Sequence, residues 1–124
     1  MAMLIHSFRD LVVWQKGMDL VTEIYRLSKK FPKDELFGLT SQIRRAAVSI
    51  PSNIAEGRGK SSKGEFQQFL YHSRGSLVEV ETQVITAQNL GYLNAAETEP
   101  VIEIIAEVGR LLHGLLAAIK KTKH

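Results

Sequence analysis

Apolar residues recur every three or four positions along most of the chain, and this spacing predicts four amphipathic helices. The expected helices span about residues 8–30, 36–57, 62–90 and 97–121. The sequence has no stretch of alternating apolar and polar residues and no Asn-Gly turn, so it gives no indication of strands. We therefore expect an all-α fold.

The first helix has two adjoining apolar stripes, which together form a face wider than one neighbouring helix covers. This helix is therefore expected to contact several neighbours. One stripe consists of Leu11, Trp14, Met18, Val21 and Tyr25, and the other consists of Val13, Gly17, Leu20, Ile24 and Leu27.

Each of the other three helices has one main apolar stripe. In the second helix, Pro51 lacks a backbone donor, which predicts a kink or a break near Ser49. Residues 57–62 are expected to form a turn, and Ser62 with Glu65 predicts a capping box for the third helix. The stripes consist of Leu36, Leu39, Ile43, Ala46, Ile50 and Ile54, then Phe66, Leu70, Ser73, Leu77, Val80, Val84, Ala87 and Gly91, and finally Val101, Ile105, Val108, Leu112, Leu115 and Ile119.

Short connections place helices that follow one another antiparallel, so the expected architecture is an up-down-up-down four-helix bundle. A chain of 124 residues is expected to form a single domain over residues 1–124. The absence of cysteine excludes disulfides and thiolate metal sites. No apolar run approaches the roughly 20 residues of a membrane-spanning helix, and we expect a cytoplasmic protein.

Charge is distributed unevenly along the chain. The net charge is +3, but residues 26–74 contain ten bases and four acids, whereas residues 79–107 contain six acids and no Lys or Arg. An antiparallel bundle brings the N-terminus, the turn at 57–62 and the C-terminus to one end. The bases expected there are Arg9, Arg58, Lys60, Lys63, Lys120, Lys121 and Lys123, against Asp10, Glu56 and Glu65.

This basic end is the candidate binding surface for nucleic-acid phosphates. The residues assigned to it are Arg9, Arg58, Lys60, Lys63, Lys120 and Lys121. At the opposite end, Lys29, Lys30 and Lys33 stand against Asp34, Glu35, Glu97 and Glu99. A mobile turn whose lysines serve only solubility is the alternative interpretation of residues 57–62.

The sequence offers no convincing catalytic or metal site. Phe69 and Arg110 precede His72 and His113 by three residues, so the Glu-x-x-His pairs of di-iron bundles are missing. Ile54 stands where a phosphate-binding loop ending at Gly59 needs glycine. We expect no enzymatic activity, no bound metal and no cofactor.

Three arginines lie in the middle of the expected helices: Arg44, Arg45 and Arg74. They are expected either to form a layer of salt bridges with Glu79 and Glu81, or to serve a subunit interface or RNA phosphates. Small and polar residues on neighbouring flanks of the second and third helices favour self-association. The residues assigned to the oligomer interface are Gln42, Arg45, Ser49, Phe69, Ser76 and Gln83.

Several segments resemble one bacterial family, the four-helix-bundle proteins encoded by intervening sequences of 23S ribosomal RNA genes. The most specific is LTSQIRRAAVSIPSNIAEG at residues 39–57. The resemblance extends over about residues 8–119. Gly17 departs from it, because the family commonly has alanine there. The other matching segments are FRDLVVWQK at 8–16, Glu65-Phe66 with Phe69-Leu70, GSLVE at 75–79 and LGYL at 90–93.

The resemblance implies an antiparallel bundle that assembles into a ring-like homopentamer without enzymatic activity. A related branch, the accessory protein of diversity-generating retroelements, binds nucleic acid and a reverse transcriptase through a basic pentameric barrel. The sequence is therefore compatible with two functions. The first is RNA binding through the basic end of a homo-oligomer, and the alternative is an oligomeric scaffold that recruits a partner such as a reverse transcriptase without touching nucleic acid.

Overall fold

The computed structural model describes residues 7–121, and these form four long helices and two short 3-10 turns. The long helices are α1 (Val12–Ser28), α2 (Leu39–Arg58), α3 (Lys63–Asn89) and α4 (Ala95–Lys121). The 3-10 turns are η1 (Phe8–Asp10) and η2 (Lys33–Glu35). No strand occurs among these residues, which confirms the expected all-α fold.

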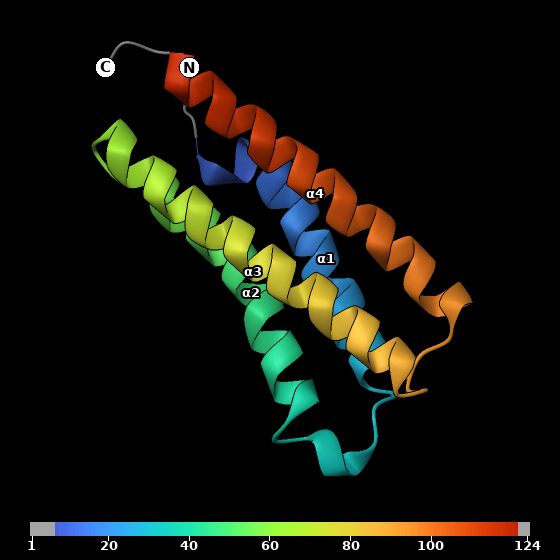
Figure 1. The fold of residues 1–124 in the computed structure, drawn as a ribbon. Helices are drawn as coiled ribbons and strands as arrows, with labels where there is room; N and C mark the ends of the chain where they lie inside the picture. Colours follow the sequence, from blue (N-terminus) through green and yellow to red (C-terminus); the bar gives the residue numbers. More distant parts are fainter. Residues whose placement is uncertain (1–6, 122–124) are drawn as a thin grey trace.

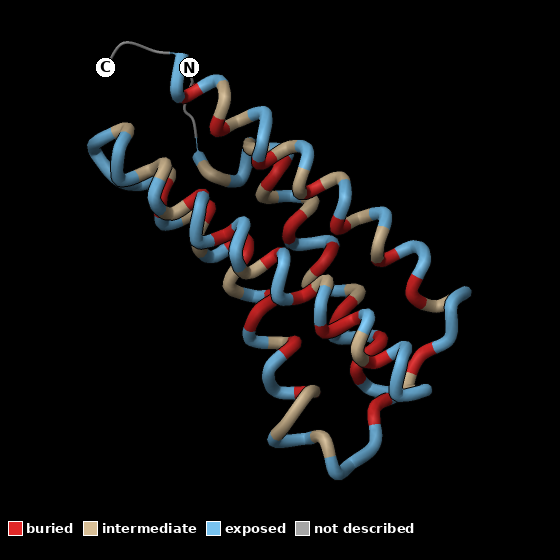
Figure 2. The backbone as a smooth tube through the Cα atoms, in the orientation of Figure 1, coloured by how far each residue is buried: buried red, intermediate tan, exposed pale blue. Residues whose placement is uncertain are grey.

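The helices run alternately up and down and form a four-helix bundle, as expected (Figure 1). Each helix packs against two others, and the α2–α3 pair has the most extensive contact. Figure 2 shows the buried positions along the inner sides of the helices. No helix within residues 7–121 combines the length and the apolar character needed to cross a membrane.

The core uses only one of the two stripes of α1. Val13, Gly17, Leu20, Ile24 and Leu27 are all buried. The other stripe is covered incompletely, since Met18 and Tyr25 are about two-fifths exposed. Both stripes have helical spacing, so only the placement of the neighbouring helices decides which one enters the core.

The other core positions agree with the expected stripes except at a few places. Leu36 is exposed because it follows η2 and lies outside α2, which begins at Leu39. In α4, Leu116 is buried and Leu115 only partly so. Pro51 does not break α2, which continues through it to Arg58. The predicted break is therefore wrong.

Caps fix both ends of α3. Ser62 Oγ accepts from the amide of Glu65 at 3.1 Å, as the predicted capping box requires. At the other end Gly91 has a φ of 82°, and the Tyr92 amide donates to the Ala87 carbonyl. This is a Schellman motif, in which glycine adopts the left-handed conformation without a Cβ penalty. The chain then reverses into α4.

Candidate nucleic-acid interface

The six bases assigned to phosphate binding lie at one end of the bundle. Arg9 belongs to η1, Arg58 ends α2, Lys60 and Lys63 belong to the α2–α3 connection and the start of α3, and Lys120 and Lys121 end α4. Figure 1 shows η1, this connection and the C-terminal end of α4 at the same end of the molecule. These six residues are called the basic end below. Lys123, also expected there, lies outside the described residues.

The turn between α2 and α3 is shorter than the sequence suggested. Residues 57–62 were expected to form the turn, but α2 extends through Arg58. Gly57 is buried inside the helix, and a Cβ atom there would lie 2.7 Å from Cβ of Phe69. Glycine is required at this position because the two helix backbones approach closely. The close approach holds the bases of α2 and α3 near each other.

The bases of this end have few carboxylate partners. Arg9, Arg58, Lys60, Lys120 and Lys121 form no ion pair with any carboxylate among residues 7–121. Of the three acids at this end, Glu65 accepts a hydrogen bond from Ser62 Oγ. Within the described residues, the charges of these five bases are therefore not neutralised by ion pairs.

Three of these cations lie over aromatic rings. Arg9 Cζ lies 5.8 Å from the centroid of the Phe8 ring, Lys60 Nζ lies 5.4 Å from that of Phe69, and Lys120 Nζ lies 5.9 Å from that of Tyr71. A cation over a ring keeps its charge and gains attraction from the π electrons. Tyr71 was not assigned to a surface from the sequence, although its i, i+3 spacing from Arg74 is visible there.

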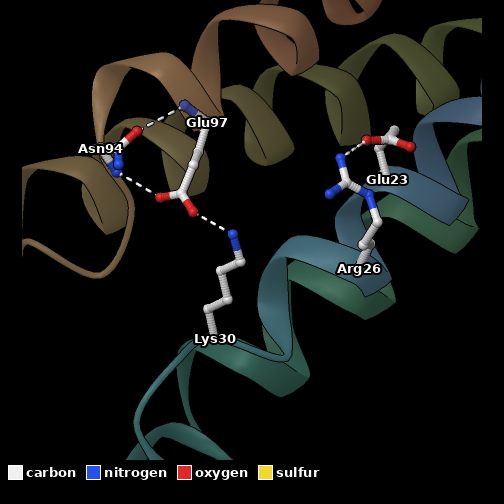
Figure 3. Close-up of polar contacts among 5 residues, drawn as sticks. All are labelled: Glu23, Arg26, Lys30, Asn94 and Glu97. Carbon is white, nitrogen blue, oxygen red and sulfur yellow. Dashed lines mark hydrogen bonds and ion pairs between the residues drawn. The ribbon is translucent and has the colours of Figure 1, made fainter.

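The opposite end is organised differently, because its charges pair within the chain. Figure 3 shows Lys30 of the α1 end bonded to the carboxylate of Glu97, which also accepts from the amide of Asn94 at 2.9 Å. Asn94 Oδ1 accepts in return from the Glu97 amide at 2.8 Å, so these residues cap α4 reciprocally. Arg26 pairs with Glu23 nearby. The bond from Lys30, then that from the Asn94 amide, lowers the pKa of Glu97.

Glu35 is also engaged at this opposite end. Its carboxylate accepts from the Leu39 amide at 3.0 Å and from the Tyr92 hydroxyl at 2.8 Å. The amide first, and then the hydroxyl, lowers the pKa of Glu35 below its usual value. The same bond raises the pKa of Tyr92. Acidic side chains at this end therefore stabilise connections between helices.

The expected layer of salt bridges in the middle of the bundle is not present among residues 7–121. Arg44 Nε donates to Ser28 Oγ at 2.7 Å, and its guanidinium lies 4.8 Å from the centroid of the Tyr25 ring. Arg74 lies over Tyr71 at the same distance. The predicted salt bridges are wrong because Arg44 is bonded to Ser28 and lies over Tyr25 of α1, and Arg74 lies over Tyr71 of its own helix.

A polar groove separates the exposed sides of α2 and α3. Ser49 and Ser76 share a hydrogen bond of 2.8 Å across it, and Asn53 Nδ2 donates to the Ser49 carbonyl. Four of the six residues assigned to the oligomer interface line this groove, namely Gln42, Arg45, Ser49 and Ser76. Its full lining is Ser41, Gln42, Arg45, Ala46, Ser49, Ser76 and Glu79.

The other two residues of the expected interface lie elsewhere. Phe69 is partly buried against Gly57 and under Lys60. Gln83 is 8% exposed, and its Oε1 has no hydrogen-bond partner among the described residues. The flank that looked uniform in the sequence is thus divided into a groove, an aromatic contact and a buried amide.

An apolar surface between α1 and α2 was not assigned to any contact from the sequence. It consists of the uncovered stripe of α1 and the residues of α2 beside it, and we call it the apolar face. Val48 is 39% exposed, similar to Met18 and Tyr25. The residues of the apolar face are Trp14, Met18, Val21, Tyr25, Val48 and Pro51.

Neither histidine discussed above has an arrangement that suggests catalysis. His72 and His113 are both exposed, and His72 contacts the ring of Phe69. Within residues 7–121, no group of three or more His, Asp or Glu residues is placed to hold a metal ion.

Comparison with known proteins found a matching family model and a solved structure with a similar fold. A family model described as 23S rRNA-intervening sequence protein matches residues 9–114. A crystal structure of a protein of unknown function from the S23 ribosomal protein family of Bacteroides thetaiotaomicron has a similar fold, with a TM-score of 0.78 at 23% sequence identity. The likeness covers 89% of this chain and 99% of that one. A comparison with curated proteins gave no match.

Proposed function

The chain belongs to the family of 23S rRNA-intervening sequence proteins, and on this premise we propose that it is a cytoplasmic, non-enzymatic homo-oligomer that binds RNA through its basic end. The observation that supports this most is the contrast between the two ends of the bundle. Arg9, Arg58, Lys60, Lys120 and Lys121 lack carboxylate partners within residues 7–121, whereas Glu97 and Glu35 at the other end are bonded within the chain. An RNA backbone supplies the missing negative charge.

Self-association adds to this proposal because one copy is only weakly basic. Within the described residues, six bases at the basic end stand against Asp10, Glu56 and Glu65. Several copies whose basic ends point the same way would contact more phosphates together, and affinity depends steeply on that number. The family resemblance suggests a pentamer. The polar groove and the apolar face are the two surfaces available for contact between copies.

The test is RNA binding followed by fluorescence anisotropy over a range of salt concentrations. Replacing Arg58, Lys60 and Lys63 together by Ala is expected to weaken binding about tenfold or more at low salt and to reduce the salt dependence. The matched control replaces Lys29 and Lys33, two exposed lysines of the opposite end, and is expected to bind as the wild type does. Equal affinity of both variants would refute the assignment of the basic end.

The alternative function is a scaffold that recruits a protein partner. The specific observation in its favour is the apolar face, because contiguous exposed apolar residues often mark protein contacts. If the wild-type protein does not bind RNA even at low salt, the scaffold is supported and RNA binding is rejected.

A further inference from the structure

An exposed tyrosine lies between two cations on the side of the bundle next to the basic end. Tyr71 of α3 is 36% exposed. Arg74 Cζ, one turn further along α3, lies 4.8 Å from its ring centroid, and Lys120 Nζ of α4 lies 5.9 Å from it. The cluster therefore combines a π surface with positive charge from two helices.

Both cations of this cluster are available to an anion. Arg74 and Lys120 are exposed, and neither pairs with a carboxylate within residues 7–121. Both cations lie over the ring of Tyr71, so a base that stacks there takes the place of a cation, which then moves to the adjacent phosphate. Aromatic rings beside unpaired cations are the usual combination in proteins that bind single-stranded nucleic acid.

The surface around the ring is open. Gly75 follows Tyr71 by one helical turn and is exposed, and a Cβ atom there would meet no other atom within 4 Å. Gly64, near the start of the same helix, is equally open. No other part of the described chain therefore covers this helix at Gly75 or at Gly64.

A second ring and cation lie near the start of α3, the ring on α3 and the cation on the α2–α3 connection. Lys60 Nζ lies over Phe69, whose ring centroid is 6.0 Å from that of the exposed His72. Phe69 packs against Gly57 of α2, whereas Tyr71 lies beside Lys120 of α4, so the two rings lie on different sides of α3. The ring of Phe69 and its cation are therefore a separate cluster near the basic end.

We propose that Tyr71 is a stacking site for one base of a single-stranded RNA, with Arg74 and Lys120 binding the adjacent phosphates. This inference rests on the proposed function and specifies its substrate. A base in a duplex already stacks on its neighbours and is paired, so it is not free to lie on a protein ring. The cluster consequently selects single strands over duplexes, which charge alone does not do.

The experiment compares two RNAs with equal numbers of phosphates, a fluorescent oligouridine strand and a duplex. Tyr71→Leu in the full chain is expected to weaken binding of the strand about 5- to 100-fold, the range for losing one stacked base, and to leave the duplex affinity unchanged. Tyr71→Phe keeps the ring and is expected to retain strand binding. Helix content and melting temperature of each variant show that it is folded.

Tyr25→Leu is the matched control. Tyr25 is 39% exposed, and a guanidinium, that of Arg44, also lies 4.8 Å from its ring centroid. It belongs to the apolar face of α1, not to the first half of α3, and leucine keeps that face apolar. The variant is therefore expected to sediment as the wild type does and to leave both affinities unchanged. The control separates stacking at Tyr71 from a general effect of removing an exposed tyrosine.

Two results would overturn the stacking site: unchanged strand affinity of Tyr71→Leu, or equal weakening of strand and duplex. Neither bears on the basic end, which is tested by the variant that replaces Arg58, Lys60 and Lys63. If that variant weakens both RNAs while Tyr71→Leu weakens neither, RNA binding stands and stacking is rejected. If the wild type binds neither RNA, both proposals are rejected.

Discussion

Two buried glycines in helices have opposite roles, and the surrounding atoms explain why. At Gly17 a Cβ atom would lie 3.5 Å from Cβ of Pro51, which is ordinary van der Waals contact. At Gly57 it would lie 2.7 Å from Cβ of Phe69 and 3.1 Å from Cδ1 of Phe66. The first glycine leaves space for a methyl group, and the second occupies a position where only glycine fits.

We therefore predict that Gly17→Ala stabilises the protein and Gly57→Ala destabilises it. Alanine at residue 17 is expected to add about 0.5–1 kcal/mol to the free energy of unfolding, because it restricts the unfolded chain and favours the helix. Alanine at residue 57 is expected to cost about 1–3 kcal/mol, because α3 has to move away. Urea unfolding measures both, and a change of the same sign in the two variants would contradict the packing described here.

Gln83 gives a prediction about a buried polar group. Its Oε1 lacks a partner among the described residues while the side chain is almost fully buried. Gln83→Met keeps a similar volume and removes the unsatisfied oxygen, so it is expected to raise the free energy of unfolding by about 1 kcal/mol. Urea unfolding at low protein concentration measures this, with Gln42→Met at the exposed groove as control. A loss of stability would contradict the cost assigned to the unpaired Oε1.

At the scale of the helices, the spacing of apolar residues predicted each long helix, but it did not predict in every case which face of the helix is buried. In α3 the expected stripe from Leu70 to Ala87 is buried throughout, because a single stripe has only one way to face the core. In α1 two stripes compete, and the spacing alone cannot choose between Ile24 and Tyr25. The cation–ring pairs of Arg44 with Tyr25 and of Lys120 with Tyr71 each join two helices, and a helical repeat does not specify such contacts.

Two carboxylates at the end opposite the basic end predict a dependence of stability on pH. Glu97 and Glu35 both have a lowered pKa in the folded protein. Their contribution to stability is fully present above the ordinary Glu pKa of about 4.3 and is lost as the pH falls through the lower folded values. The melting temperature is therefore expected to fall on acidification below about pH 4.3.

Glu97→Gln separates two contributions of Glu97 to stability, the ion pair with Lys30 and the hydrogen bond that caps α4. Glutamine can still accept from the Asn94 amide, but it neither ionises nor attracts Lys30. The variant is expected to melt lower than the wild type at neutral pH and to change less with acidification. Glu99→Gln, on the exposed surface of the same helix turn, is the control. A wild-type acid profile in Glu97→Gln would contradict a stabilising role for the Lys30 pair.

At the scale of the whole molecule, the sequence predicted that the two ends of the bundle differ in charge. It could do so because the order of antiparallel helices decides which end each residue lies at. The basic end was identified correctly as a place in the fold, since Arg58, Lys60 and Lys120 follow from where helices begin and end. The surfaces for contact between copies were harder to assign. The polar groove follows the flank of small residues, but the apolar face became visible only once the core had taken the other stripe of α1.

Contact between copies and RNA binding are linked, and this gives the last prediction. We expect the wild type to sediment as a multiple of 13.9 kDa. Gln42→Trp fills the polar groove and Val48→Asp places a charge on the apolar face, so the variant that blocks the true interface is expected to sediment as a single chain.

Each phosphate contact changes the logarithmic salt dependence of affinity by about −0.7 to −0.9. The dissociated variant should therefore bind RNA more weakly and with a shallower salt dependence, although its basic end is intact. Sedimentation and salt titration of the same samples measure both properties, and the variant that remains assembled is the control. A dissociated variant with the affinity and salt dependence of the wild type would show that each chain binds RNA on its own.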